Sequence, residues 1–257
     1  MVDYNNLFRA CLVVVSNIAG ALNYQLANAN ENYAKVRTIE EVVVVAQKRE
    51  QNIQDVPIAI SAYSEEKIFQ QNIVSTMDLA RVEPSLNFQQ GFSDFNSNFS
   101  IRGIGAMSFE GGVQPSVSVV VDGVPLIRVG EFQGDMGDLQ SIEVLKGPQG
   151  TLFGKNATGG AINVVRNPPS KELEAYVEFL TTDDKEDTAR LMFNSPLSDK
   201  VAFRILGFIR DQKGFIENVF PGVEDDGTKR NLSFVAKLGI DINDSMEMIL
   251  TVDKFRT

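Results

Sequence analysis

Two glycine-rich segments contain the residue types of nucleotide-binding loops, and their spacing shows whether they can hold a phosphate. Segment 146–156 places three residues between its second and third glycines, and its Lys155 precedes asparagine. A P-loop needs four residues between its glycines and a Ser or Thr after the lysine. Segment 103–105 is followed by Ser108 where a dinucleotide fingerprint needs glycine. We therefore interpret both segments as backbone turns.

Nucleophilic and metal chemistry is restricted by what the chain lacks. Its 257 residues include no histidine, no tryptophan and one cysteine, Cys11. A Ser-His-Asp triad and a His-based zinc site are therefore excluded, and one cysteine can form neither an internal disulfide nor a Cys cluster. The acidic pairs 183–184 and 225–226 lack the alternating spacing of a calcium loop, which favours solvated loops. We expect no enzymatic activity, no cofactor and no metal site.

The charge balance argues against nucleic acid as a partner. The chain has 24 basic and 34 acidic side chains, a net charge of −10 and a pI near 4.7. A protein that neutralises phosphates carries a basic surface instead. With 43% hydrophobic and 23% charged residues, the composition is that of a globular protein with one or two domains.

Residues 1–29 have the pattern of a signal peptide. Arg9 is followed by an apolar run, 10–22, that is shorter than the ~20 residues of a membrane-spanning helix. Ala27 and Ala29 then provide the small-x-small pattern that signal peptidase accepts. We expect cleavage after Ala29 and export of the mature chain. The alternative is a buried core strand or helix.

The next part of the chain divides into a polar leader, 30–54, and a small α/β domain, 55–168. In the leader, the β-branched run 42–45 has polar flanks and no local partner. In the domain, short apolar runs predict strands and Asp-Gly at 122–123 predicts a tight turn. A pair of prolines ends the domain. The expected strands are 57–62, 99–102, 117–121 and 141–146, and the expected helices are 65–71 and 75–81.

The remaining residues, 169–257, form long strands in which apolar and polar residues alternate. In 173–179 and 232–242 one face is apolar, and a strand of ~10 such residues can cross an outer membrane when tilted. The connections alternate between short turns and longer loops. Transmembrane barrels show this pattern, because their turns on one side of the membrane are short. A soluble β-sandwich is the alternative from alternation alone. The expected connections are 182–187 (charged), 195–199 (tight), 212–228 (long) and 243–245 (tight).

Several of these strings together resemble the N-terminal part of TonB-dependent outer-membrane receptors. They are EVVVVA from Glu41, DVPIAI from Asp55, IRG from Ile101, VDGV from Val121, IEVLKGP from Ile142, LFG from Leu152 and GGAIN from Gly159. The resemblance implies a signal peptide at 1–29, a leader with the TonB box at 30–54, an α/β plug domain at 55–168 and the first antiparallel barrel strands at 169–257. About five strands cannot close the family's 22-stranded barrel, so we expect a truncated barrel.

The resemblance also implies roles for particular residues. The TonB box would add as a strand to the sheet of the periplasmic protein TonB, and it comprises Glu41, Val42, Val43, Val44, Val45 and Ala46. A charge cluster in the plug would act as a switch, because desolvation nearly cancels the attraction of buried pairs, and it comprises Arg102, Glu143 and Lys146. Tight turns of the plug are expected at Gly103, Asp122, Gly123, Gly147, Gly150, Gly154, Gly159 and Gly160.

The function implied by the resemblance is energised uptake of a scarce solute through the outer membrane of a Gram-negative bacterium. The expected partners are TonB with its inner-membrane energising complex, outer-membrane lipid and the solute. A ferric siderophore is the most common cargo of the family, and haem, cobalamin, nickel complexes and oligosaccharides are others. The alternative function is a stand-alone periplasmic plug-type module for binding or signalling.

Overall fold

The computed structural model describes most of the chain beyond residue 42, and residues Glu41–Thr257 form one compact unit. The predicted signal peptide, most of the leader and three residues of the predicted TonB box lie outside the described residues. The described ranges are 43–45, 48–49, 51–73, 76–89, 91, 97–106, 113–127, 137–183, 185–214, 216, 218–220 and 227–256.

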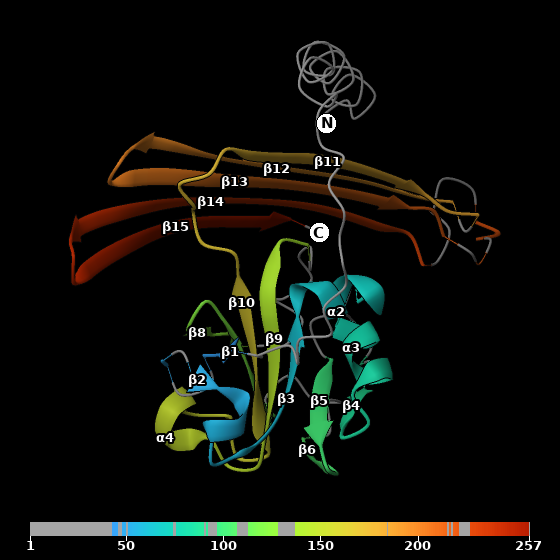
Figure 1. Cartoon of the computed structure of the whole chain (residues 1–257). Helices are drawn as coiled ribbons and strands as arrows, with labels where there is room; N and C mark the ends of the chain where they lie inside the picture. The colour runs from blue at the N-terminus through green and yellow to red at the C-terminus, as the bar shows by residue number, and fades with distance from the viewer. Residues whose placement is uncertain are drawn as a thin grey trace, which may run out of the picture. The chain divides into compact units, whose positions relative to one another are not determined.

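A mixed five-stranded sheet is the centre of the α/β domain (Figure 1). Strand β10 pairs in parallel with β7 and antiparallel with β9. All residues of β7 are buried, because its run of valines lies inside the domain on both faces of the sheet. The strands, in spatial order, are β3 (Ala59–Ser64), β9 (Leu139–Lys146), β10 (Gly160–Arg166), β7 (Val117–Val121) and β8 (Val124–Pro125).

Shorter elements surround this sheet. The predicted strand 117–121 and helix 65–71 are present as β7 and α2, and the other predicted elements are present with shifted ends. The short elements are β1 (Val43–Val44), β2 (Gln51–Asn52), η1 (Ile53–Asp55), α2 (Glu65–Gln70), α3 (Thr76–Val82), β4 (Leu86–Gln89), β5 (Asn98–Ile101), β6 (Ile104–Gly105) and α4 (Gly150–Phe153). In the part of the chain that the structure describes, no helix is long and apolar enough to span a membrane.

The central sheet has an apolar core on each face. One core contains Ile142 and Val144 of β9 together with residues from α3 and β5. The other core contains Leu145 of β9 with Val44 and Phe153. Because successive side chains of a strand point to opposite faces, β9 supplies apolar residues to both cores.

Five long strands follow the α/β domain as an antiparallel meander in chain order (Figure 1). They are β11 (Glu174–Thr181), β12 (Glu186–Ser198), β13 (Val201–Gln212), β14 (Lys229–Asn243) and β15 (Met246–Arg256). The predicted turn 195–199 is shorter than expected. The register shifts between Pro196 and Ser198, but pairing continues as far as Ser198, which lies opposite Val201. Strand β12 therefore occupies most of the range 195–199.

The meander exposes apolar side chains on one face, whereas its other face combines buried charged and polar residues with a small apolar cluster of Met192, Leu206 and Val235. In β14, Leu232 and Phe234 are 38% and 43% exposed, whereas Ser233 and Lys237 are 7% and 5% exposed. A soluble sandwich would bury the apolar face instead. The exposed apolar face therefore favours the transmembrane barrel over the soluble β-sandwich. It is the face that barrel strands turn toward lipid.

Candidate functional site at the junction of the two sheets

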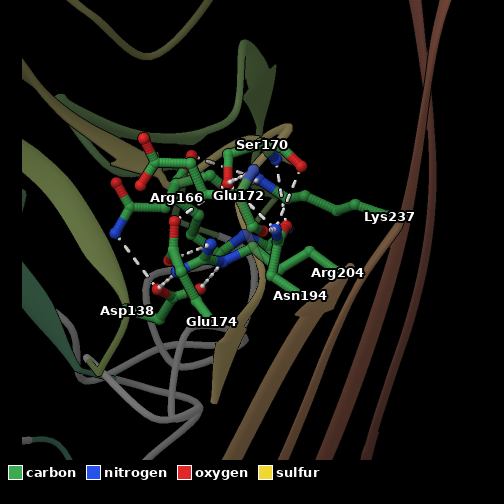
Figure 2. Close-up of polar contacts among 9 residues, drawn as sticks. Asp138, Arg166, Ser170, Glu172, Glu174, Asn194, Arg204 and Lys237 are labelled. Atoms are coloured by element: carbon green, nitrogen blue, oxygen red, sulfur yellow. Dashed lines mark hydrogen bonds and ion pairs between the residues drawn. The ribbon is translucent and has the colours of Figure 1, made fainter. Parts of the chain in front are cut away.

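A buried arginine joins the long strands to the α/β domain. Arg204 of β13 donates from Nε to Asp138 at 2.7 Å, and its Nη2 makes a second bond to the same carboxylate. Its Nη1 donates to Glu174 at the start of β11 at 3.0 Å. A bidentate pair of this kind fixes orientation as well as distance. Figure 2 shows Arg204 between the two carboxylates.

A second charged group forms around Asp122, in the turn between β7 and β8. Its carboxylate accepts from Arg166 Nε at 2.8 Å and lies 2.9 Å from Lys237 Nζ of β14. Arg166 also contacts Asp253 of β15 at 2.7 Å. Burial would raise the pKa of Asp122, but the charges of Arg166 and Lys237 outweigh burial and hold the pKa below its usual value. Asp122 has the predicted positive φ, and it also links the two sheets.

The segment that connects β10 to β11 lies between these two charged groups. Asn194 of β12 and Lys237 of β14 bind its backbone with their side chains (Figure 2). Ser170 contributes its hydroxyl, which accepts from Asn194 Nδ2 at 2.9 Å and donates to Glu174 at 2.9 Å. We call residues Arg166–Glu174 the linker. The linker and the two charged groups around it form the candidate site.

The predicted TonB box is paired, and the expectation that the run 42–45 has no local partner is wrong. Val43 and Val44 form β1, which pairs antiparallel with β2. Val44 is 0% exposed, and the N–H of Val45 donates to Glu143 at 2.5 Å. The hairpin is possible because Lys48 adopts a positive φ and donates its N–H to Val45, which turns the chain back onto itself.

The predicted charge cluster is not assembled. Glu143 and Lys146 are both on β9, but three positions separate them, so they point to opposite faces of the sheet. Arg102 is exposed in the turn between β5 and β6, where its φ is positive. Glu143 accepts instead from Asn163 at 2.9 Å, and burial raises its pKa despite the hydrogen bonds from Asn163 and Val45.

Lys146 belongs to a different polar group, centred on the buried Glu83. Lys146 Nζ lies 3.2 Å from Glu83 and donates to Ser61 at 2.8 Å. Burial acts to raise the pKa of Glu83, but hydrogen bonds from Ser85, Ser61 and Lys146 lower it to about 2. The hydroxyl of Tyr63 donates to the same carboxylate at 3.1 Å. This group holds β3 and β9 to the segment before β4.

The predicted turn residues differ in what the backbone requires of them. Positive φ angles occur at Gly103, Asp122, Gly123, Gly147, Gly154 and Gly160. Gly150 begins α4 instead. At Gly159 the need is for space, because a Cβ there would lie 2.9 Å from the carbonyl oxygen of Ile104.

A cavity of about 780 Å³ lies between α2 and the strands β11 and β12. Its lining includes Glu65 and Phe69 of α2 and Glu178 and Arg190 of the long strands. Burial and the nearby charge of Asp138 raise the pKa of Glu65. Because Asp138 also lines this cavity, the cavity adjoins the Arg204 pair.

Sequence reasoning missed most residues of the candidate site. These are Asp138, Arg166, Asn194, Arg204 and Lys237. Arg204 stands as one charge within the apolar strand VAFRILGFI, and Lys237 stands as one charge within SFVAKLGI. A charge isolated in an apolar strand was the available signal, because it must be paired when the strand is buried.

The fold and the comparisons with known proteins support the class of protein that the sequence predicted. Residues 52–161 match the family model described as the TonB-dependent Receptor Plug Domain. The α/β domain followed by antiparallel strands is similar to the plug domain and first barrel strands of TonB-dependent outer-membrane receptors.

Three similar proteins make the relationship specific. The pesticin receptor of Yersinia enterocolitica is 28% identical over 214 residues, which cover 83% of this chain and 31% of that protein. The crystal structure of the ferric yersiniabactin uptake receptor FyuA from Yersinia pestis matches with a TM-score of 0.70 and 27% identity, over 77% of this chain and 31% of that chain. The pyoverdine receptor FpvA of Pseudomonas aeruginosa shares the fold, with a TM-score of 0.66 and 20% identity, over 82% of this chain and 29% of that chain. The chain thus spans about a third of the length of the curated relatives that it matches first.

Proposed function

We propose that this chain supplies the plug and the first barrel strands of a receptor that takes up a scarce solute, such as a ferric siderophore, across the outer membrane with energy delivered by TonB. The observation that carries the proposal is the meander, in which apolar side chains of one face are exposed and charged side chains of the other face bind the plug. A plug inside a barrel requires this arrangement, since lipid is outside and the plug is inside. The name of FyuA, a ferric yersiniabactin uptake receptor, supports an iron complex as the solute.

The polar contacts between plug and strands suit a part that must be held and later moved. Arg204 with Asp138 and Lys237 with Asp122 are largely buried pairs. Their desolvation offsets most of their attraction, so such pairs specify a position without adding much stability. A plug held in this way closes the lumen and can still be displaced by work done from the periplasm.

The TonB box would reach its partner only after leaving the plug. Recognition by strand addition requires a free strand edge. In the structure, Val43 and Val44 pair with β2, and the N–H of Val45 is bound to Glu143. Because Val44 is also 0% exposed, binding of TonB to Glu41–Ala46 would require β1 to leave the plug.

Uptake of radiolabelled iron tests the proposed function. Cells that carry the gene are compared with a deletion strain and with a strain that lacks TonB, using ferric yersiniabactin and ferripyoverdine as probes. We expect the deletion to remove TonB-dependent uptake of at least one ferric siderophore and complementation to restore it. Equal uptake of the supplied complexes with and without the gene would contradict an iron-siderophore function.

A further inference from the structure

We propose that the linker, Arg166–Glu174, stays bound to the inner face of the barrel strands throughout the uptake cycle, with Asn194 and Lys237 as its positioning residues. This inference rests on the proposed uptake function. It assigns the two ends of the plug different behaviour, because the end at the TonB box must detach and the end at the linker would not.

Asn194 makes the most extensive contact with the linker. It is 0% exposed, and its Oδ1 accepts from the N–H of Ser170 at 3.0 Å. Its Nδ2 donates to the carbonyl of Ser170 at 3.0 Å and to the carbonyl of Glu172 at 2.6 Å. An amide group alone offers both an acceptor and two donors at this position. The side chain therefore binds the linker backbone on both sides of Lys171.

Lys237 binds the preceding part of the linker. Its Nζ donates to the carbonyl of Arg166 at 3.2 Å and to the carbonyl of Asn167 at 3.3 Å. The same ammonium group contacts Asp122 at 2.9 Å, so its charge is balanced where it is buried. One cation thus joins β14, the linker and the turn after β7.

Packing supports the same conclusion between these two contacts. Pro168 and Pro169 have no N–H and a fixed φ, which limits the motion of the linker there. A Cβ added at Gly239 of β14 would lie 3.5 Å from the ring of Pro169. Strand β14 therefore has a glycine at the position where Pro169 packs.

The described residues of the TonB box, Val43–Val45, are held in a different way. Val43 and Val44 pair with β2, Val44 packs in an apolar core, and the N–H of Val45 donates to Glu143. Force applied at the leader would act on these contacts first, because they are nearer to the leader in the chain than the linker is. The linker contacts lie at the far end of the plug in sequence and involve five backbone groups.

Reversible crosslinking in the whole protein tests the inference. Cys11 is the only cysteine of the 257 residues, and it lies in the predicted signal peptide, so cysteines introduced into residues 30–257 meet no native cysteine within that range. The Ser170 hydroxyl and Asn194 Nδ2 are 2.9 Å apart in the native protein. In S170C/N194C, a short thiol crosslinker that can be cleaved with reductant would therefore fix the linker to β12. In V44C/Q51C, whose positions are paired in register, the same reagent would fix the TonB box.

We expect the crosslinked S170C/N194C protein to take up solute at the rate of its reduced form. The crosslinked V44C/Q51C protein should lose uptake and regain it after reduction. Loss of uptake on crosslinking S170C/N194C, with recovery on reduction, would overturn the inference. Failure of the proposed function gives a separate result, namely no TonB-dependent uptake by the unmodified protein.

Single cysteines provide a second measurement that does not need the double variant. The alkylation rate of S170C should not change when solute and energy are supplied, whereas that of V44C should rise. In S170C/N194D, which loses both amide donors to the linker backbone, alkylation should be faster by at least about tenfold, which corresponds to ~1.4 kcal/mol. N87D, at an exposed asparagine of β4, is the matched control and should leave the rate unchanged. A rise at S170C during uptake, or no effect of N194D, would contradict the inference.

Discussion

Glu143 is a buried carboxylate of the plug and Asp122 is a partly buried one, and their surroundings shift their pKa values in opposite directions. Asp122 faces two cations, Arg166 and Lys237, which hold its pKa low. Among the described residues, Glu143 accepts from two neutral donors, Asn163 and the N–H of Val45, and burial raises its pKa. The carboxylate that contacts the TonB box is therefore the one that is costly to keep ionised.

Glu143→Gln is expected to remove a pH dependence of plug stability. The raised pKa means that the folded state binds more protons than the unfolded state at pH values just above the usual value of 4.5. The free energy of unfolding then falls as pH rises through this window. Urea denaturation at pH 4.5 and at pH 8 measures the difference. The variant should lose less stability than the parent between these two pH values, and an identical loss would show that Glu143 is not responsible.

Arg204→Met tests whether the buried pair specifies position more than it adds stability. Removing Arg204 alone leaves Asp138 buried without its cation, at a cost of ~3 kcal/mol. The double variant R204M/D138N should recover most of this cost, because asparagine is neutral and tolerates the positive φ at that position. Leakage of a large antibiotic through the outer membrane reports plug closure. Leakage as high in the double variant as in R204M would contradict this account.

Gly160→Ala is expected to destabilise the plug by at least ~2 kcal/mol, because the backbone strain adds to a steric clash. Gly160 has a φ of 148°, and an added Cβ would lie 2.3 Å from the carbonyl oxygen of Leu145. Gly150→Ala is the control, since nothing lies within 4 Å of a Cβ there. Urea denaturation compares the two variants, and equal stabilities would contradict the steric explanation.

At the scale of elements, the segment that forms β1 has two possible partners, β2 within the plug and the protein TonB. The backbone of Val43 and Val44 pairs within the plug here, and the same backbone would pair with TonB in uptake. Either pairing needs an extended strand with its N–H groups available. A change to the backbone therefore has a different effect from a change to a side chain.

Val44→Pro should abolish energised uptake while leaving solute binding at the cell surface unchanged. Proline removes the backbone donor that strand pairing uses and disrupts the pairing of the strand that contains it. Val44→Ala, which reduces burial but keeps the N–H, should retain uptake. Transport of radiolabelled iron at 37 °C and surface binding at 0 °C separate the two steps. Uptake that survives proline would remove the TonB-box assignment.

Local patterns predicted the elements well and their contacts poorly. The valine run of β7 and the alternation in β11 and β14 were correctly assigned because they depend on neighbouring residues. The predicted charge cluster of Arg102, Glu143 and Lys146 was wrong. Glu143 and Lys146 are three positions apart on one strand, so their side chains lie on opposite faces of the sheet. The Arg204–Asp138 pair joins residues 66 positions apart, and one sequence offers no register from which to predict it.

At the scale of the whole molecule, the plug and the meander differ in the surface that they expose to solvent. We expect residues 41–170, produced without membranes, to be soluble and monomeric, because the plug has apolar cores on both faces of its sheet. Residues 41–257 should aggregate in water, since their exposed apolar side chains include Leu191, Leu250 and Val252. Gel filtration distinguishes these outcomes. A monomeric, fully soluble 41–257 would contradict a lipid-facing surface.

The backbone contacts of the linker have a consequence for exchanging domains between receptors. Asn194 and Lys237 bind carbonyl and N–H groups that every residue except proline provides. A foreign plug could therefore be grafted onto these strands, provided that the number of residues between Arg166 and Glu174 is kept together with the side chains of Arg166, Pro169 and Ser170 that also bind or pack there. Insertion of one residue would move the Ser170 groups away from Asn194. Linker length would then limit which hybrid receptors assemble, even where these side chains are kept.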